Sequence, residues 1–189
     1  MQILMGACFL EQVVPDTILF NLKPLVKLSV PVPKLRELSG RSARGFFIEM
    51  NSEYKTSLEI RIDWADLDLF GHVNNVAFFK YVQAARVDYC ESIGLTSLNE
   101  PGKNSFMVAS SQCQFKKPIL FPGSVRVLTK VEWIKNTSLQ LAYKLLNQNN
   151  ELVAEATDVI VVFDHHTKQK VQIDDQLKSI IEKTEGRQF

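Results

Sequence analysis

Cysteine is scarce in this sequence, and the three that occur, Cys8, Cys90 and Cys113, lie far apart. No C-x-x-C pair is present, so the spacing favours neither a zinc site nor a disulfide framework. Thiols of this kind are typical of proteins in a reducing compartment, where they are buried or incidental. We therefore expect a cytoplasmic protein without disulfide bonds.

A surplus of charge of one sign is also missing, and so is a long apolar run. The formal net charge of the 189 residues is +1, so no overall field attracts nucleic acid or an anionic membrane. No uninterrupted apolar stretch reaches about 18 residues, so a membrane-spanning helix is not predicted. With 46% hydrophobic and 23% charged residues, the composition is that of an ordinary globular protein of one domain.

Residues 1–49 lack the regular patterns of the rest of the chain. Their apolar residues follow no period for long, because the segment is interrupted by Pro15, Pro24, Pro31 and Pro33. A secretory signal fits poorly, since the first basic residue, Lys23, follows the apolar start. An organelle transit peptide, which would place the protein in a plastid, and a non-native extension before a start at Met50 both stay open. We predict a disordered extension over 1–49 and a folded domain over 50–189.

Five segments of the remaining chain have the pattern of strands. In the first, apolar and charged residues alternate, which puts on one face Leu58, Ile60, Ile62 and Trp64. The other four are predicted from similar patterns and from the turn residues that bound them, over about 106–116, 125–133, 139–145 and 152–163. Because short turns join these four strands, we expect antiparallel pairing.

A long helix is predicted between the first strand and the second. Asn74 is a favoured N-cap, the segment runs to about Ile93, and Gly94 is the expected stop. Apolar residues occupy most of its circumference, so we expect the other elements to wrap around it. The prediction is therefore an α+β fold, in which a curved antiparallel sheet surrounds one central helix and a terminal helix follows over 174–183.

The densest group of reactive side chains lies between the first strand and this helix. Asp66, Asp68 and His72 precede a helix start, whose free N–H groups stabilise negative charge. The residues alone leave four interpretations open: a phosphatase-type D-x-D, a metal site, an acid–base pair as in a hydratase, and a purely structural cap. A phosphatase fits poorly, because Phe70 stands where such sites usually carry Thr or Val.

A family resemblance rests on the string W-A-D-L-D-L-F-G-H-V-N-N-V-A-F-F-K-Y-V-Q-A-A-R at residues 64–86. It resembles the 4-hydroxybenzoyl-CoA thioesterase-like family of hotdog proteins, in which D-x-D, G-H-V-N-N and an aromatic-rich helix occur together. The motif K-P-I…G at 117–123 and the strand order also fit, so the similarity spans about 58–163. The resemblance implies the hotdog fold and hydrolysis of acyl-CoA thioesters without a metal or a cofactor.

The resemblance also assigns the site. It makes the second aspartate of D-x-D, Asp68, the catalytic residue, as a nucleophile or as a general base on water. The backbone N–H of Asn75 would polarise the thioester carbonyl. A thiol, with a pKa of about 8.5, is a good enough leaving group that no Ser-His-Asp triad is required. His72 either supports this chemistry or only orients the loop.

Further residues are expected at the substrate. The aromatic ones either line the acyl pocket or belong to the core, and the basic ones either meet the phosphates of coenzyme A or of a carrier protein's phosphopantetheine, or are solvated charges. The set comprises the helix cap Asn74, the aromatic residues Phe78, Phe79 and Phe106, and the basic residues Lys116, Lys117 and Arg126.

By the same resemblance we expect a homodimer or homotetramer with the acyl site at the subunit interface, because an unpaired sheet edge favours pairing between copies. An acyl-carrier-protein thioesterase is the first alternative. A hotdog hydratase or dehydratase and a non-catalytic acyl-binding module are further ones, although the gap between Asp68 and His72 is short for a hydratase pair.

Overall fold

The computed structural model of the protein describes residues 53–95 and 104–189. The predicted extension over 1–49 and the alternative start at Met50 lie outside the described residues. The elements within them are β1 (Thr56–Arg61), the 3-10 helix η1 (Trp64–Asp66), α2 (Asn75–Ser92), β2 (Ser105–Phe115), β3 (Ser124–Ile134), β4 (Ser138–Asn147), β5 (Leu152–Asp164), β6 (Gln169–Lys170) and α3 (Asp175–Glu185).

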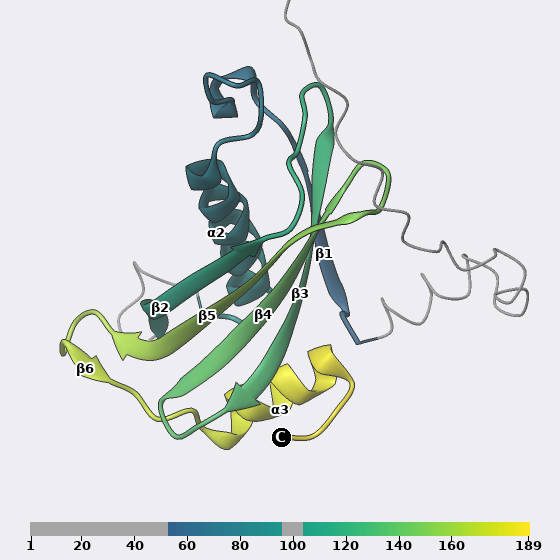
Figure 1. Ribbon diagram of the computed structural model, residues 1–189. Helices are drawn as coiled ribbons and strands as arrows, with labels where there is room; N and C mark the ends of the chain where they lie inside the picture. The colour runs from purple at the N-terminus through teal and green to yellow at the C-terminus, as the bar shows by residue number, and fades with distance from the viewer. Residues whose placement is uncertain (1–52, 96–103) are drawn as a thin grey trace, which may run out of the picture. The chain divides into compact units, whose positions relative to one another are not determined.

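The strands form one antiparallel sheet in the order β1-β3-β4-β5-β2, and the two-residue β6 pairs with β5 outside this order. β2 follows α2 in the chain yet pairs with the last long strand, so β1 and β2 form the two edges. Figure 1 shows the curved sheet with α2 on one side of it. This arrangement confirms the predicted α+β fold with a central helix.

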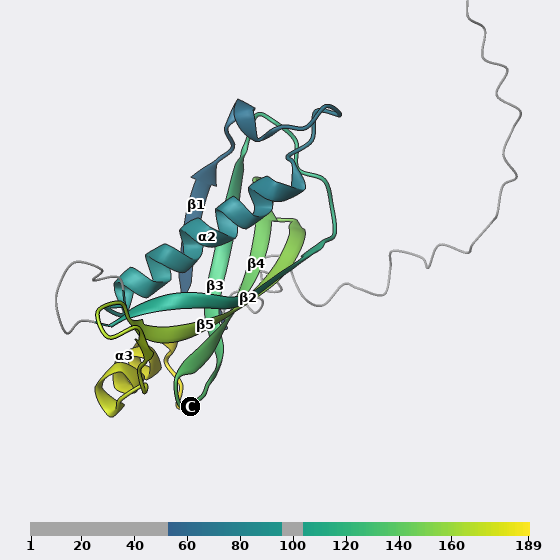
Figure 2. The same cartoon turned by 90° about the vertical axis from the view of Figure 1, so that its left-hand side faces the viewer.

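α2 begins and ends where its capping residues predict. The side chain of Asn74 accepts a hydrogen bond from the N–H of Val76 (3.0 Å), and Gly94 follows the helix with φ +81°. Figure 2 shows the helix lying across the face of the sheet. Within 53–95 and 104–189, no helix is both long enough and apolar enough to cross a membrane.

The sheet covers only one face of α2 in a single copy, although the apolar residues around the helix predict burial on most of its circumference. Tyr81 and Tyr89 are among the residues that pack on the sheet and are almost fully buried. The opposite face exposes apolar side chains, with Val76 68%, Phe79 38% and Val87 37% accessible. The exposed face therefore carries apolar side chains beside polar ones, and no described residue covers it.

Trp64 does not belong to the first strand, which corrects the alternation predicted from Leu58 onward. β1 ends at Arg61, and the side chain of Asp63 then accepts a hydrogen bond from the N–H of Ala65 (2.9 Å), capping η1. Because this turn replaces the extended backbone, the Trp64 side chain is 74% exposed instead of buried.

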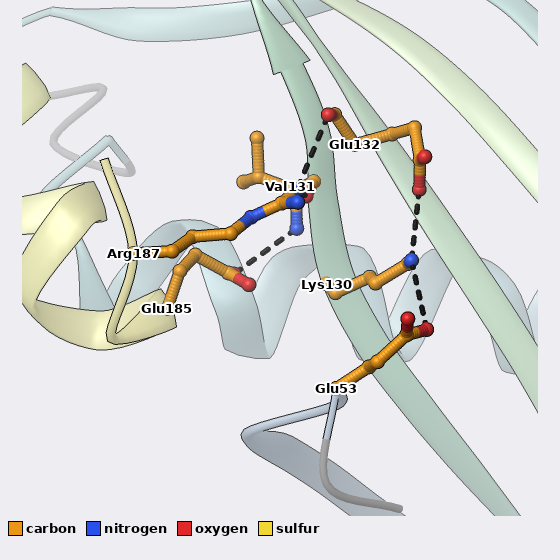
Figure 3. A network of polar contacts seen from close by, with 6 residues as sticks. All are labelled: Glu53, Lys130, Val131, Glu132, Glu185 and Arg187. Atoms are coloured by element: carbon orange, nitrogen blue, oxygen red, sulfur yellow. Dashed lines mark hydrogen bonds and ion pairs between the residues drawn. The ribbon is translucent and has the colours of Figure 1, made fainter. Parts of the chain in front are cut away.

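α3 completes the edge of β3 where β1 stops. β1 pairs with β3 only as far as Thr129. Beyond it, the buried carboxylate of Glu185 accepts hydrogen bonds from the N–H of Val131 (3.0 Å) and from the hydroxyl of Tyr89 on α2 (2.6 Å). Arg187 donates to two carbonyl oxygens of the same strand. Figure 3 shows these two side chains reaching β3, so side chains replace the missing backbone partner.

Candidate active site

The loop between β1 and α2 is folded back on itself by backbone hydrogen bonds. The N–H of Asn74 donates to the carbonyl of Asp66, and the N–H of Asp68 to the carbonyl of His72, each at 2.8 Å. The turn between Asp68 and His72 includes Gly71, whose φ of +78° lies in the left-handed region that favours glycine. The loop therefore has a defined shape before any ligand binds.

The motif K-P-I…G at 117–123 holds this loop from outside. The N–H of Val73 donates to the carbonyl of Ile119 (2.9 Å), and the N–H of Ile62 donates to that of Gly123 (3.0 Å). Both ends of the loop are thus hydrogen-bonded to the segment 117–123, which connects β2 to β3. The backbone carbonyls of this motif therefore support the loop that contains the two aspartates.

The carboxylate of Asp68 is half-buried, and one of its oxygens is bound by its own loop. Oδ1 accepts hydrogen bonds from the N–H groups of Phe70 (2.9 Å) and His72 (3.1 Å). The second oxygen, Oδ2, accepts none from the described residues. One oxygen therefore fixes the side chain, and the other stays available to a ligand or a water.

Asn75 is the first residue of α2, and its backbone N–H has no partner among the described residues. The next two N–H groups of the helix are both bound by Asn74, that of Val76 by the side chain (3.0 Å) and that of Ala77 by the carbonyl (2.9 Å). The Asn75 N–H is therefore the unpaired donor at the positive end of the helix.

A cleft of about 370 Å³ joins the loop, the start of α2 and the end of β2. One wall is aromatic, because the rings of Phe78 and Phe115 meet edge to face with their centroids 5.0 Å apart. The cleft is lined by Asp68, His72, Val73, Asn75, Phe78, Phe115, Lys116, Lys117 and Pro118.

Six of the predicted site residues therefore lie together, and four lie elsewhere. Asn74 caps the helix but does not line the cleft. Phe79 is on the exposed face of α2, and Phe106 packs against the core. Arg126 donates to the side chain of Asn150 (3.2 Å), away from the cleft.

Both lysines of the cleft are paired with glutamates. Lys116 lies 2.7 Å from Glu155, and Lys117 lies 2.8 Å from Glu151. All four side chains are more than a third exposed, so these pairs are weak and screened by salt. An anionic ligand can therefore compete with the glutamates for the lysines.

Asp66 is turned away from the cleft and is 8% exposed. Burial by itself raises the pKa of its carboxyl, but hydrogen bonds from Lys80 and Tyr81 outweigh this effect and hold the pKa below its ordinary value. In the part of the chain that the structure describes, no three His, Cys, Asp or Glu side chains are placed to share a metal ion.

The sequence did not single out three residues of the cleft: Val73, Phe115 and Pro118. Pro118 belongs to the K-P-I motif, and Phe115 directly precedes Lys116 in a predicted strand. Their neighbours in the sequence, Lys116 and Lys117, could therefore have indicated both residues. No local pattern pairs Phe115 with Phe78, because sheet order alone brings β2 next to the helix start.

Comparison with known proteins identifies the family. Residues 62–181 match the thioesterase-like superfamily. The uncharacterized protein YsmA of Bacillus subtilis (strain 168) is 26% identical over 133 residues, which are 68% of this chain and 89% of YsmA. The long-chain acyl-CoA thioesterase FadM of Escherichia coli (strain K12) is 20% identical over 125 residues, 66% of this chain and 95% of FadM.

A solved structure extends the similarity to three dimensions. The thioesterase of Thermus thermophilus, in complex with coenzyme A and zinc, is 26% identical, with a TM-score of 0.64 over 72% of this chain and 98% of that one. The family match extends from the end of β1 into α3 and includes the whole cleft. The chain therefore belongs to the thioesterase-like superfamily and has its hotdog fold.

Proposed function

We propose that this chain hydrolyses acyl-CoA thioesters to a free acid and coenzyme A, with Asp68 and the backbone N–H of Asn75 as its catalytic groups. The observation that carries the proposal is the cleft, where a carboxylate with one free oxygen, an unpaired helix N–H, an aromatic wall and two lysines line one space. The names of FadM, an acyl-CoA thioesterase, and of the Thermus thermophilus thioesterase complexed with coenzyme A support this substrate class.

In the proposed reaction, the thioester carbonyl oxygen accepts a hydrogen bond from the N–H of Asn75, and the helix dipole stabilises the charge that develops there. Asp68 then either takes a proton from the water that attacks the carbonyl carbon, or attacks this carbon itself to form an anhydride that water cleaves. Both routes break the carbon–sulfur bond, consume one water and release the thiol. The two roles of Asp68 remain alternatives.

Lys116 and Lys117 are proposed to bind the phosphates of the substrate at the mouth of the cleft, while Phe78 and Phe115 contact the acyl group. Phosphopantetheine is common to coenzyme A and acyl-carrier proteins, so an acyl-carrier-protein thioesterase is the second candidate. His72 lines the same cleft, and we propose a supporting role for it beside Asp68.

We further propose that two copies associate through β2. This strand of 11 residues is a sheet edge with exposed apolar side chains, among them Met107 (48%) and Val108 (41%). Edge strands of this length without charges favour pairing with another chain. The uncovered face of α2 also exposes apolar side chains, so association through β2 and α2 would bury both surfaces and enclose the neighbouring cleft.

The proposal is tested by following thiol release from a panel of acyl-CoAs of different chain length and from matched acyl-carrier proteins. Asp68→Asn is expected to lower kcat by about a hundredfold or more, the usual contribution of such a group, with the circular dichroism spectrum unchanged. Asp175→Asn, at an exposed aspartate of α3, is the control and should keep the wild-type rate. A wild-type rate in Asp68→Asn would overturn the assignment. Turnover of carrier-protein substrates alone would replace acyl-CoA as the substrate.

A further inference from the structure

We propose that Asp66 is a positioning residue for this site: through Tyr81 it holds the loop of Asp68 and the N–H of Asn75 in their reactive arrangement. The inference rests on the proposed function and adds to it a group of supporting residues outside the cleft. It concerns the first aspartate of the D-x-D pair, which contacts neither the cleft nor any substrate placed there.

The carboxylate of Asp66 connects the loop to α2 through side-chain hydrogen bonds. Oδ2 accepts from the hydroxyl of Tyr81 (2.9 Å) and from the N–H of Asp63 (3.3 Å), and Oδ1 accepts from the ammonium of Lys80 (2.8 Å). Tyr81 is 1% exposed and Lys80 is mostly exposed, so the tyrosine is the rigid member of this group.

The backbone of Asp66 makes a second connection, to the residue that caps the helix. Its carbonyl accepts from the N–H of Asn74 (2.8 Å), one residue before the Asn75 N–H. Asp66 and Asn74 thus close the loop that contains Asp68, and the side chain of Asp66 fixes this closed loop on the first turns of α2. A shift of Asp66 would move the carboxylate and the N–H relative to each other.

We expect a disturbance of this arrangement to lower the turnover rate strongly and the stability of the fold only slightly. An error of about 1 Å between reacting groups lowers turnover by up to about a hundredfold, while the loss of one hydrogen bond to a buried carboxylate leaves a domain of this size folded. Tyr81→Phe is therefore the sharpest change, because it removes one oxygen and keeps the ring in the core.

The chain contains a matched control on the same helix. Tyr89, about two turns further along α2, donates from its hydroxyl to the buried carboxylate of Glu185 (2.6 Å). Tyr81→Phe and Tyr89→Phe thus remove the same atom from the same kind of bond, one beside the loop and one at the distant end of the helix.

The experiment compares kcat, KM and the midpoint of thermal unfolding for the two variants of the full chain with the best acyl-CoA of the panel. We expect about tenfold lower kcat for Tyr81→Phe, with KM within about twofold, because the loss is one of geometry at the reacting atoms. Tyr89→Phe is expected to lower the unfolding midpoint at least as much and to keep the wild-type kcat. Equal kcat values in the two variants would overturn the proposal.

Hydrogen–deuterium exchange of the peptides that cover 67–76 decides the question separately from activity. Faster exchange in Tyr81→Phe than in Tyr89→Phe is expected, and unchanged exchange in Tyr81→Phe would also overturn the inference. If the wild-type chain hydrolyses no thioester, the proposed function fails, while the exchange result still shows whether Asp66 and Tyr81 fix the loop.

Discussion

Arg86 of α2 and Asp158 of β5 form an ion pair of 2.6 Å, in which the carboxylate is fully buried and the guanidinium is 12% exposed. The hydroxyl of Tyr143 donates to the same oxygen of Asp158 (2.9 Å), whereas the other carboxylate oxygen has no partner among the described residues. The pKa of Tyr143 lies far above its ordinary value, mainly because the hydroxyl is buried. The negative charge of Asp158 and the hydrogen bond to it raise this pKa further. The centre of α2 is therefore attached to the sheet by charge as well as by apolar packing.

Breaking this pair is expected to destabilise the fold strongly. Arg86→Met leaves a buried carboxylate without its cation, which costs about 3–5 kcal/mol of unfolding free energy. The triple variant Arg86→Met, Asp158→Leu and Tyr143→Phe removes both charges and the buried hydroxyl that donates to Asp158, and should recover most of this loss. Urea denaturation of the two variants measures the difference, and a single variant as stable as the wild type would show that the pair contributes little.

The two lysines of the cleft should act on the phosphates of the substrate and not on the acyl group. Replacing both Lys116 and Lys117 by Ala is expected to raise KM for an acyl-CoA by about tenfold, the value of one or two charge-assisted contacts. The same acyl group on N-acetylcysteamine, which has no phosphate, should keep its KM. An equal rise for both thioesters would contradict a role in phosphate binding.

Acid should weaken the fold through Asp66. Its pKa in the folded chain is held below the ordinary value of 3.8, so the unfolded chain takes up the proton first as the pH falls. The stabilisation is complete above about pH 5 and is lost as the pH falls through the lowered pKa. Unfolding midpoints measured from pH 6 to pH 3 should therefore fall less steeply in Asp66→Asn than in the wild type, and equal slopes would contradict this account.

If two copies associate through β2, a charged residue near the middle of that strand should prevent the association. Ser110→Lys puts two like charges close together when the strand pairs with its own copy, which disfavours the pair. Ser179→Lys, at an exposed position of α3, makes the same change away from this edge. Light scattering after gel filtration should show a smaller mass for Ser110→Lys alone, and a wild-type monomer would refute the proposal.

Local signals in the sequence predicted the elements of the fold well. Asn74 and Gly94 mark the limits of α2, because caps act within one turn of the chain. The five main strands appear where apolar and polar residues alternate. Trp64 was wrongly assigned to the first strand, because the alternation of apolar and charged residues continues past Asp63, which caps η1. Alternation alone does not show where a strand ends.

The centre of the candidate site was predictable because its residues are close in the sequence, whereas Lys116 and Lys117 were predicted from their charge alone. Asp68, His72 and Asn75 lie on one loop, so a local motif was enough to group them. The contact of Phe78 with Phe115 depends on β2 pairing with β5, which no local pattern encodes. Phe79 looked equivalent to Phe78, but one step of about 100° around a helix puts it on the uncovered face.

The way the edge of β3 is closed has a consequence for synthesis of the chain on the ribosome. β1, which covers one half of the edge, is made before β3, but Glu185 and Arg187, which cover the other half, are made after every strand of the sheet. The nascent sheet therefore carries an open edge beside Val131 until these residues leave the exit tunnel. During that interval an unpaired strand is available to neighbouring chains, and the order of synthesis sets how long this period of risk lasts.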